Sequence, residues 1–189
     1  MKRPFLEEKF AAALDYAAYL KTGTDQQRER WKKVYDAGNL TEAQKALLGG
    51  FVREMNLLVV SGIWCGDCVQ QCPLMARIAE GNPEKIRLRF VDRDLHADLS
   101  EQVQLNGGGR VPVMISMAED FEFCGLAGDR SLNRYRAMAK RHLGAACPTG
   151  IVAPDQNELA ATLCDWLGEI ERIQLMLRLS TRLRELHGD

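Results

Sequence analysis

The chain has 189 residues, 46% hydrophobic and 27% charged, as in a water-soluble globular protein of one domain with a sizeable core. Its formal net charge of -1 gives no bulk attraction to nucleic acid or to an anionic membrane, so neither partner is expected. No apolar run approaches the length of a transmembrane helix, and the opening MKRPFLEEKF carries acids where a signal peptide needs an apolar stretch. We therefore expect a cytoplasmic protein whose six cysteines are catalytic, metal-binding or buried, rather than a disulfide scaffold.

Residues 1–55 are predicted to form a helical N-terminal extension. Pro4 stands where the first turn of a helix tolerates proline, and apolar residues recur near helical spacing until Gly23, which should end this first helix. A second helix is predicted over 25–36, and the capping-box pattern that begins at Thr41 predicts a third. The apolar positions of the first helix are Phe5, Leu6, Phe10, Leu14 and Ala17.

Residues 56–144 change to a pattern typical of an α/β domain. The continuous apolar run Leu57–Val60 predicts a strand buried on both faces. Strands are predicted over 57–61, 86–91, 112–117 and 121–124, the last two as a hairpin, with helices reaching about residue 80 and covering 131–143. The alternating arginines of 86–91, Arg87 and Arg89, suit an exposed sheet edge.

Residues 145–189 are predicted to form a loop and a C-terminal helix packed on the domain. The segment Asp155–Glu158 gives an N-cap pattern for that helix. Its apolar residues are spaced alternately by four and three, which predicts a seam that packs on the body of the protein or on a second copy. A homodimer through this helix is therefore one expectation. The seam consists of Leu159, Leu163, Trp166, Ile170, Ile173 and Leu177.

The segment Trp64-Cys65-Gly66-Asp67-Cys68 carries the chemistry that we expect of this chain. It follows the buried strand and opens a helix, whose unpaired N–H groups and dipole stabilise a thiolate. The thiolate is the species that attacks a disulfide. Because Cys68 lies one helical turn after Cys65, the two thiols are within disulfide reach. We predict that Cys65 attacks a substrate disulfide and that Cys68 resolves the mixed disulfide.

Other interpretations of the cysteines stay open at this point. A metal site would combine Cys65, Cys68 and Cys72 with a fourth ligand from Cys124 or Cys147. We favour the redox interpretation, with no metal and no cofactor, because the other residues around the motif have no role in a metal site. Cys72 lies on the same helical face as Cys68 and is interpreted as a small buried side chain, with a third exchanging thiol as the alternative.

This motif resembles the active site of the thioredoxin superfamily. Trp64-Cys65-Gly66-x-Cys68 matches the family motif, and Pro73 stands where thioredoxins place the proline that kinks the active-site helix. Val111-Pro112 matches the family's cis-proline, which lies against the dithiol and helps to hold the substrate backbone. The chain is also similar to bacterial thioredoxin-like proteins with WCGDC and a segment like Asp92-Arg93-Asp94. The resemblance implies a thioredoxin-like fold over about 57–143 and thiol–disulfide oxidoreductase activity. That fold has a central mixed sheet, here of four strands in the order 86–91, 57–61, 112–117, 121–124, with the first two parallel and the hairpin antiparallel to them. Thioredoxins add an N-terminal strand beside the one that matches 86–91, and because the N-terminal region here is predicted to be helical, 86–91 should be a sheet edge.

Two departures from the family pattern bear on the mechanism. Asp67 replaces the usual proline between the cysteines, and Val59 stands where thioredoxins hold a buried aspartate. A carboxylate beside Cys65 should raise the pKa of that thiol, whereas the helix N-terminus opposes the change, so a modest increase is expected. Asp67 is also the nearest carboxylate in sequence that could accept the proton of Cys68. The alternative is that Asp67 points to solvent and only begins the helix.

These observations favour an enzyme that reduces protein or small-molecule disulfides and is itself reduced by a thiol reductant or a reductase. The alternative is a thioredoxin-fold binding or regulatory module, whose dithiol is not used for general disulfide reduction. The intact motif and Pro112 favour the enzyme, while the size of the flanks keeps the alternative open. We expect the flanks to pack on the core and either to restrict access to Cys65 or to mediate self-association.

Overall fold

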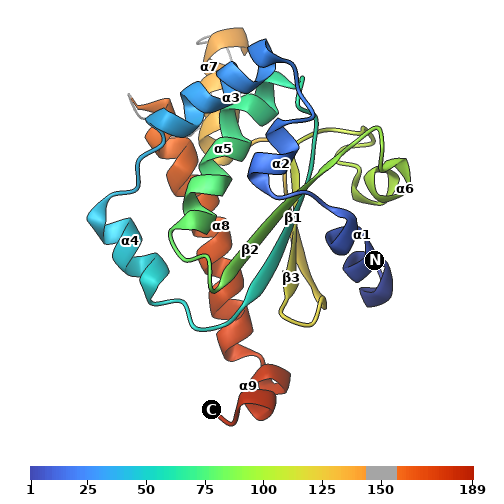
Figure 1. Ribbon diagram of the computed structural model, residues 1–189. Coiled ribbons are helices and arrows are strands. Elements are labelled where there is room, and N and C mark those ends of the chain that lie inside the picture. The colour runs from blue at the N-terminus through green and yellow to red at the C-terminus, as the bar shows by residue number, and fades with distance from the viewer. Residues whose placement is uncertain (144–156) are drawn as a thin grey trace.

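The computed structural model describes residues 1–143 and 157–189, and its elements form a layered α/β fold (Figure 1). The strands are β1 (Met55–Ser61), β2 (Ile86–Asp92), β3 (Val113–Ala118) and β4 (Phe123–Gly128). The helices before the motif are α1 (Arg3–Ala12), α2 (Tyr16–Leu20), α3 (Asp25–Ala37) and α4 (Glu42–Gly49). Those that follow are α5 (Gly66–Glu80), α6 (Ala97–Ser100), the 3₁₀ turn η1 (Glu101–Val103), α7 (Leu132–Leu143), α8 (Glu158–Leu179) and α9 (Thr181–His187).

The four strands form one mixed sheet in the order β2-β1-β3-β4, as predicted from the sequence. β1 pairs with β2 in parallel and with β3 in antiparallel register. β4 is antiparallel to β3, so it runs in the direction of β1, and only the first strand of the hairpin opposes the parallel pair. Every residue of β1 is buried, which agrees with its unbroken apolar run. The end of this central strand carries the cysteine motif.

The predicted first helix is wrong in its length, because the chain breaks it between α1 and α2. Leu14 forms an isolated antiparallel bridge with Phe90 of β2, and the side chain of Asp15 then caps α2. Arg89 donates a hydrogen bond to the carbonyl oxygen of Ala13 at 2.9 Å, so it is not the solvated edge residue that its alternation indicated. The bridge satisfies backbone groups at the centre of the β2 edge, which local spacing could not reveal.

α5 lies against one face of the sheet with α3 and α8 beside it, while α1 and α6 lie on the other side (Figure 1). Trp31 of α3 is fully buried and donates a hydrogen bond from Nε1 to the carbonyl oxygen of Ile63 at 3.0 Å. The N-terminal extension is thereby fixed to the segment that leads into the motif. None of the helices in the described residues is both long and apolar enough to span a membrane.

The apolar seam of α8 packs within the chain. Its residues from Leu163 to Leu177 are buried in the same core as the sheet. A homodimer through α8 therefore has to use other side chains, and it stays a prediction. The division of the chain into three parts at residues 55 and 144 also stays a prediction. Asn157 caps α8, which begins at Glu158, whereas residues 155 and 156 of the predicted cap segment and Cys147 lie outside the described residues.

Candidate active site

The two motif cysteines occupy different environments at the start of α5. Cys65 is the N-cap residue of the helix, in an extended backbone conformation, and its side chain is partly exposed. Cys68 lies one turn inside the helix and is fully buried, and both residues are free thiols. Apart from its chain neighbours and the backbone of α5, no described atom lies within 4 Å of the position that a Cβ of Gly66 would take, so the space next to Cys65 is open on that side. This asymmetry is the arrangement that an attacking and a resolving thiol require.

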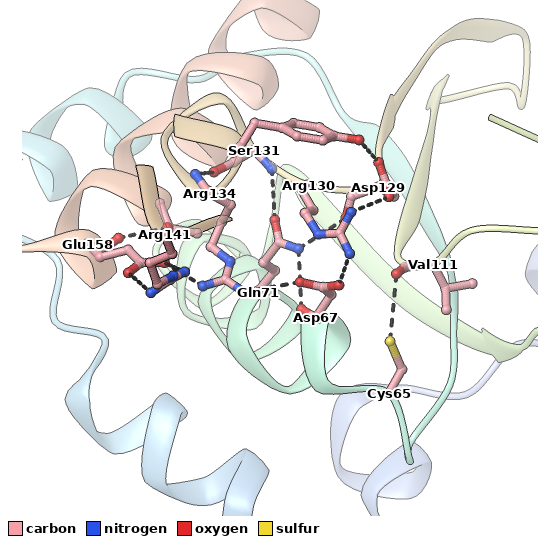
Figure 2. Close-up of polar contacts among 12 residues, drawn as sticks. Cys65, Asp67, Gln71, Val111, Asp129, Arg130, Ser131, Arg134, Arg141 and Glu158 are labelled. Atoms are coloured by element: carbon pink, nitrogen blue, oxygen red, sulfur yellow. Dashed lines mark hydrogen bonds and ion pairs between the residues drawn. The ribbon is translucent and has the colours of Figure 1, made fainter. Parts of the chain in front are cut away.

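The segment before β3 forms the opposite wall of the site. The Val111–Pro112 peptide bond is cis, and both residues are buried. The Cys65 thiol donates to the carbonyl oxygen of Val111 at a sulfur–oxygen distance of 3.7 Å (Figure 2). Pro73 lies inside α5 and is also buried. The fold therefore brings together the residues that the family resemblance singled out, although their roles in catalysis stay predictions.

Trp64 is an exposed side chain next to Cys65 in the sequence, with 48% of its surface accessible. Its ring lies against Gly62, where a Cβ would come within 2.8 Å of a ring carbon. The Arg93 guanidinium lies 4.8 Å from the centre of the ring and donates a hydrogen bond to the carbonyl oxygen of Gly109 at 3.0 Å. Arg93 also pairs with Asp94. The segment after β2 therefore contacts both Trp64 and the turn at Gly109.

Both thiols favour their protonated forms. The hydrogen bond with Cys68 and burial raise the pKa of Cys65, against the opposing effect of the backbone N–H groups of Asp67 and Cys68. Burial raises the pKa of the Cys68 thiol, while hydrogen bonds with Cys65 and Ser61 lower it. The causes that raise the pKa prevail in both residues. The stabilisation of the Cys65 thiolate expected at a helix N-terminus is present, but it is the weaker effect.

Asp67 does not point to solvent, so that alternative for its side chain is wrong, whereas the effect of its charge on the pKa of Cys65 stays a prediction. Its carboxylate accepts hydrogen bonds from Arg130 at 2.6 Å and from Arg134 at 3.1 Å (Figure 2). The side chains of Asp67 and Arg134 are 19% and 8% exposed, so this is a largely buried ion pair. With two guanidinium partners, Asp67 is poorly placed to accept a proton from Cys68. Its carboxylate instead ties the start of α5 to α7.

The ion pairs extend to Arg110, the residue that precedes Val111 and Pro112. Asp129 is buried and pairs with Arg130 at 3.1 Å and with Arg110 at 3.3 Å. Tyr135 donates a further hydrogen bond to Asp129. Because Arg130 also binds Asp67, alternating charges connect the motif helix with the segment that faces Cys65 (Figure 2).

Gln71 holds the centre of the same network. It is fully buried and donates hydrogen bonds to the carbonyl oxygens of Asp67 and Asp129 at 3.2 and 3.0 Å. Its side-chain oxygen accepts from the backbone of Ser131 and from Trp166 of α8 at 2.9 and 3.2 Å. The sequence offered one unused signal for this network, which is two arginines four residues apart, Arg130 and Arg134, directly after a strand.

In residues 1–143 and 157–189, no group of three or more His, Cys, Asp or Glu side chains is placed to hold a metal ion. The thiols of Cys65 and Cys68 lie together at one site.

Two solved structures share this fold. A protein of unknown function from Pseudomonas aeruginosa superposes with a TM-score of 0.69 at 19% identity, over 88% of this chain and 95% of that one. An HIV epitope scaffold superposes with a TM-score of 0.66 at 19% identity, over 88% and 97% of the two chains. Oxidised mitochondrial thioredoxin 3 from Saccharomyces cerevisiae gives a TM-score of 0.34 at 18% identity, over 50% and 86%.

No curated protein matches the sequence. A family model described as thioredoxin matches residues 13–140, which is more than half of the chain. The matched region includes all four strands, the motif helix and the cis-proline segment. This chain therefore belongs to the thioredoxin family.

Proposed function

We propose that this chain is a thiol–disulfide oxidoreductase that works as a disulfide reductase, with Cys65 as the attacking thiol and Cys68 as the resolving thiol. The observation that carries the proposal is the asymmetry of the two thiols, one partly exposed at the helix start and one fully buried a turn later. A substrate sulfur can approach Cys65, whereas Cys68 can reach only a sulfur that is already bound to Cys65.

The reaction has two exchange steps. The Cys65 thiolate attacks one sulfur of the substrate disulfide, a Cys65–substrate bond forms, and the other substrate sulfur leaves as a thiolate that takes up a proton. The Cys68 sulfur then attacks Cys65, and the second substrate sulfur leaves. The substrate gains two electrons and two protons, and the protein ends with a Cys65–Cys68 disulfide. A thiol reductant or a reductase restores the dithiol.

The direction of the reaction follows from the protonation of the thiols. A dithiol whose thiolate is strongly stabilised is a strong oxidant, because its reduced form is favoured. Here the hydrogen bond with Cys68 and burial raise the pKa of Cys65, and burial raises the pKa of Cys68, so the thiolate gains little stabilisation. The disulfide form is correspondingly favoured, and the pair is expected to give electrons to its substrates.

A second candidate function is that of a binding module. Leucines on the last two helices remain exposed, with 55% of the surface of Leu175, 78% of Leu179 and 65% of Leu186 accessible. Such a group of apolar side chains favours a docking surface for a partner or a second copy. A binding module would keep its partner when both motif cysteines are replaced by serine, whereas the oxidoreductase would lose its activity.

An insulin-reduction assay tests the enzyme directly. We expect the wild-type chain to accelerate insulin precipitation in the presence of a thiol reductant and Cys65→Ser to be inactive. Cys68→Ser should accumulate substrate mixed disulfides at Cys65. Cys164→Ser is the matched control, because Cys164 is an exposed free thiol on α8, and it should retain full activity. Equal activity of the wild type and Cys65→Ser would reject the proposal.

A further inference from the structure

A second group of polar side chains lies around the Cys68 thiol. Ser61, at the end of β1, is fully buried, and its hydroxyl oxygen lies 3.6 Å from the Cys72 sulfur. Cys72 is also fully buried and follows Cys68 by one turn of α5, so the two thiols share a face of the helix. The Ser61 hydroxyl lies beside the Cys68 thiol as well. Cys68 is therefore enclosed by two small polar groups in an otherwise apolar core.

Tyr19 of α2 adds a third polar group to this cluster. Its side chain is fully buried, and none of the described residues satisfies its hydroxyl with a well-formed hydrogen bond. The Ser61 hydroxyl lies beside it, on the side toward the thiols. The cluster of Tyr19, Ser61, Cys72 and Cys68 thus joins α2, β1 and α5 through groups that can each donate a proton to a neighbour.

This arrangement meets a chemical need that the rest of the site leaves open. Cys68 must part from its proton while it attacks Cys65, and an anionic sulfur in a buried site is costly without a hydrogen-bond donor. Asp67 binds two arginines, and Val59, two residues before Ser61 on the same face of β1, is apolar. The titratable side chains around Cys68 are the thiols of Cys65 and Cys72 and the phenol of Tyr19, and none of them is a carboxylate.

We propose that Ser61 takes part in the resolving step, by donating a hydrogen bond to the sulfur of Cys68 as negative charge develops on it. This inference rests on the function proposed above. Cys72 holds the hydroxyl in place, because it can exchange a hydrogen bond with Ser61. In the resolving step, the Cys65–Cys68 bond forms and the Cys65–substrate bond breaks. The proton of Cys68 ends on the leaving substrate sulfur, and no other oxidant or reductant is needed.

The experiment uses 5,5′-dithiobis(2-nitrobenzoate), an aromatic disulfide whose thiolate product absorbs visible light. Attack by Cys65 releases the first thiolate, and attack by Cys68 on the resulting mixed disulfide releases the second. Cys124, Cys147 and Cys164 are replaced by serine in every variant so that they do not react. Stopped-flow traces of the full chain then report the attacking and the resolving step as separate phases.

Ser61→Ala should leave the first phase unchanged and slow the second by about tenfold or more, as expected for the loss of a hydrogen bond to a charged sulfur. The rise of the second phase with pH should also move to higher pH. Ser116→Ala removes a buried serine from the adjacent strand β3 and should change neither phase. If Ser61→Ala does not fold, Ser61→Thr and Ser61→Val give the same comparison at equal shape, with the second phase faster in the threonine variant.

The outcomes separate this inference from the proposed function. If the wild type releases two thiolates and Ser61→Ala leaves the second phase unchanged, the role of Ser61 is overturned and the proposed function is not. Equal slowing of both phases would also overturn it, since that result indicates a structural effect on the whole site. A wild-type chain that releases no thiolate in the first phase would instead contradict the oxidoreductase itself.

Discussion

The carboxylate of Asp67 is bound by Arg134, a residue 67 positions later in the chain, at 3.1 Å. The residue between the two motif cysteines is thus part of the packing between α5 and α7. Arg134 pairs in turn with Glu158 at the start of α8. The start of α5 is therefore bound by Arg134 of α7, which in turn pairs with Glu158 of α8. Each of these contacts can be tested.

Asp67→Asn should lower both the pKa of Cys65 and the stability of the fold. The substitution removes a negative charge next to the motif and leaves the positive charges of Arg130 and Arg134, which favour a thiolate. It also weakens a largely buried ion pair, for which we expect a loss of about 1–3 kcal/mol in the free energy of unfolding. Thiolate absorbance against pH and denaturation in urea measure the two effects.

The control for this variant is Asp94→Asn. Asp94 is exposed and pairs with Arg93 on the other side of the motif, so its replacement should change stability by no more than about 0.5 kcal/mol. If Asp67→Asn titrates and unfolds like the wild type, the ion pairs of Asp67 contribute nothing to the site.

The alkylation of Cys65 should keep accelerating at alkaline pH. Its hydrogen bond with Cys68 and its burial raise the pKa of Cys65, so the thiolate fraction is small at neutral pH and grows as the pH rises beyond the ordinary thiol range, about 8.5. Iodoacetamide rates measured against pH, with the exposed Cys164 replaced by serine, test this expectation. A rate that is already constant at neutral pH would indicate a stabilised thiolate and an oxidising pair.

Asp129 should contribute to stability above about pH 4 and lose that contribution in acid. Burial raises the pKa of Asp129, but the hydrogen bonds from Tyr135 and Arg110 and the charge of Arg130 outweigh it and hold the pKa below its ordinary value. The unfolded chain therefore binds a proton before the folded chain does, and stability falls as the pH falls through the folded pKa. Urea denaturation of Asp129→Asn should show a smaller loss of stability over this range, and an identical pH dependence would exclude the effect.

Arg93→Ala should free the indole ring of Trp64. The guanidinium covers one face of the ring, and its loss removes about 0.5–1 kcal/mol of attraction at an exposed site. We expect a larger share of the tryptophan fluorescence to become accessible to acrylamide, because the other two tryptophans, Trp31 and Trp166, are buried. Arg87→Ala, at an exposed pair with Glu54 on β2, should leave quenching unchanged.

A chain that ends at residue 154 should aggregate. It lacks α8, whose buried seam from Leu163 to Leu177 closes the core, and it leaves Gln71 without the hydrogen bond from Trp166. Light scattering and binding of a hydrophobic dye report the exposed apolar surface. A truncated chain that stays monomeric and reduces insulin like the full chain would show that α8 is dispensable.

The sequence by itself determined the elements whose signals are local. The apolar run of β1 and the capping box of α4 lie where their spacing placed them, and β3 and β4 form the predicted hairpin. The predicted bounds of the last strand, 121–124, are wrong, because β4 covers Phe123–Gly128. The four-stranded sheet and its order could also be predicted, from the resemblance of the motif to thioredoxins and from the lack of a predicted N-terminal strand. The position of Cys65 at a helix start is likewise local, since the motif directly follows a buried strand.

Only the tertiary structure decided which side chains meet. The bridge of Leu14 with Phe90, the ion pairs of Asp67 with α7 and the contact of Ser61 with Cys72 each join different elements. Spacing along one helix or strand gives the face on which a side chain lies, but not the group from another element that fills that face. The sequence places the carboxylate of Asp67 next to the thiol of Cys65, whereas the packing of α7 and of the residues before it brings Arg134 and Arg130 to that carboxylate. The partners of charged and polar groups in the site are set by the packing of the helices, because their interactions act through space over a few ångströms.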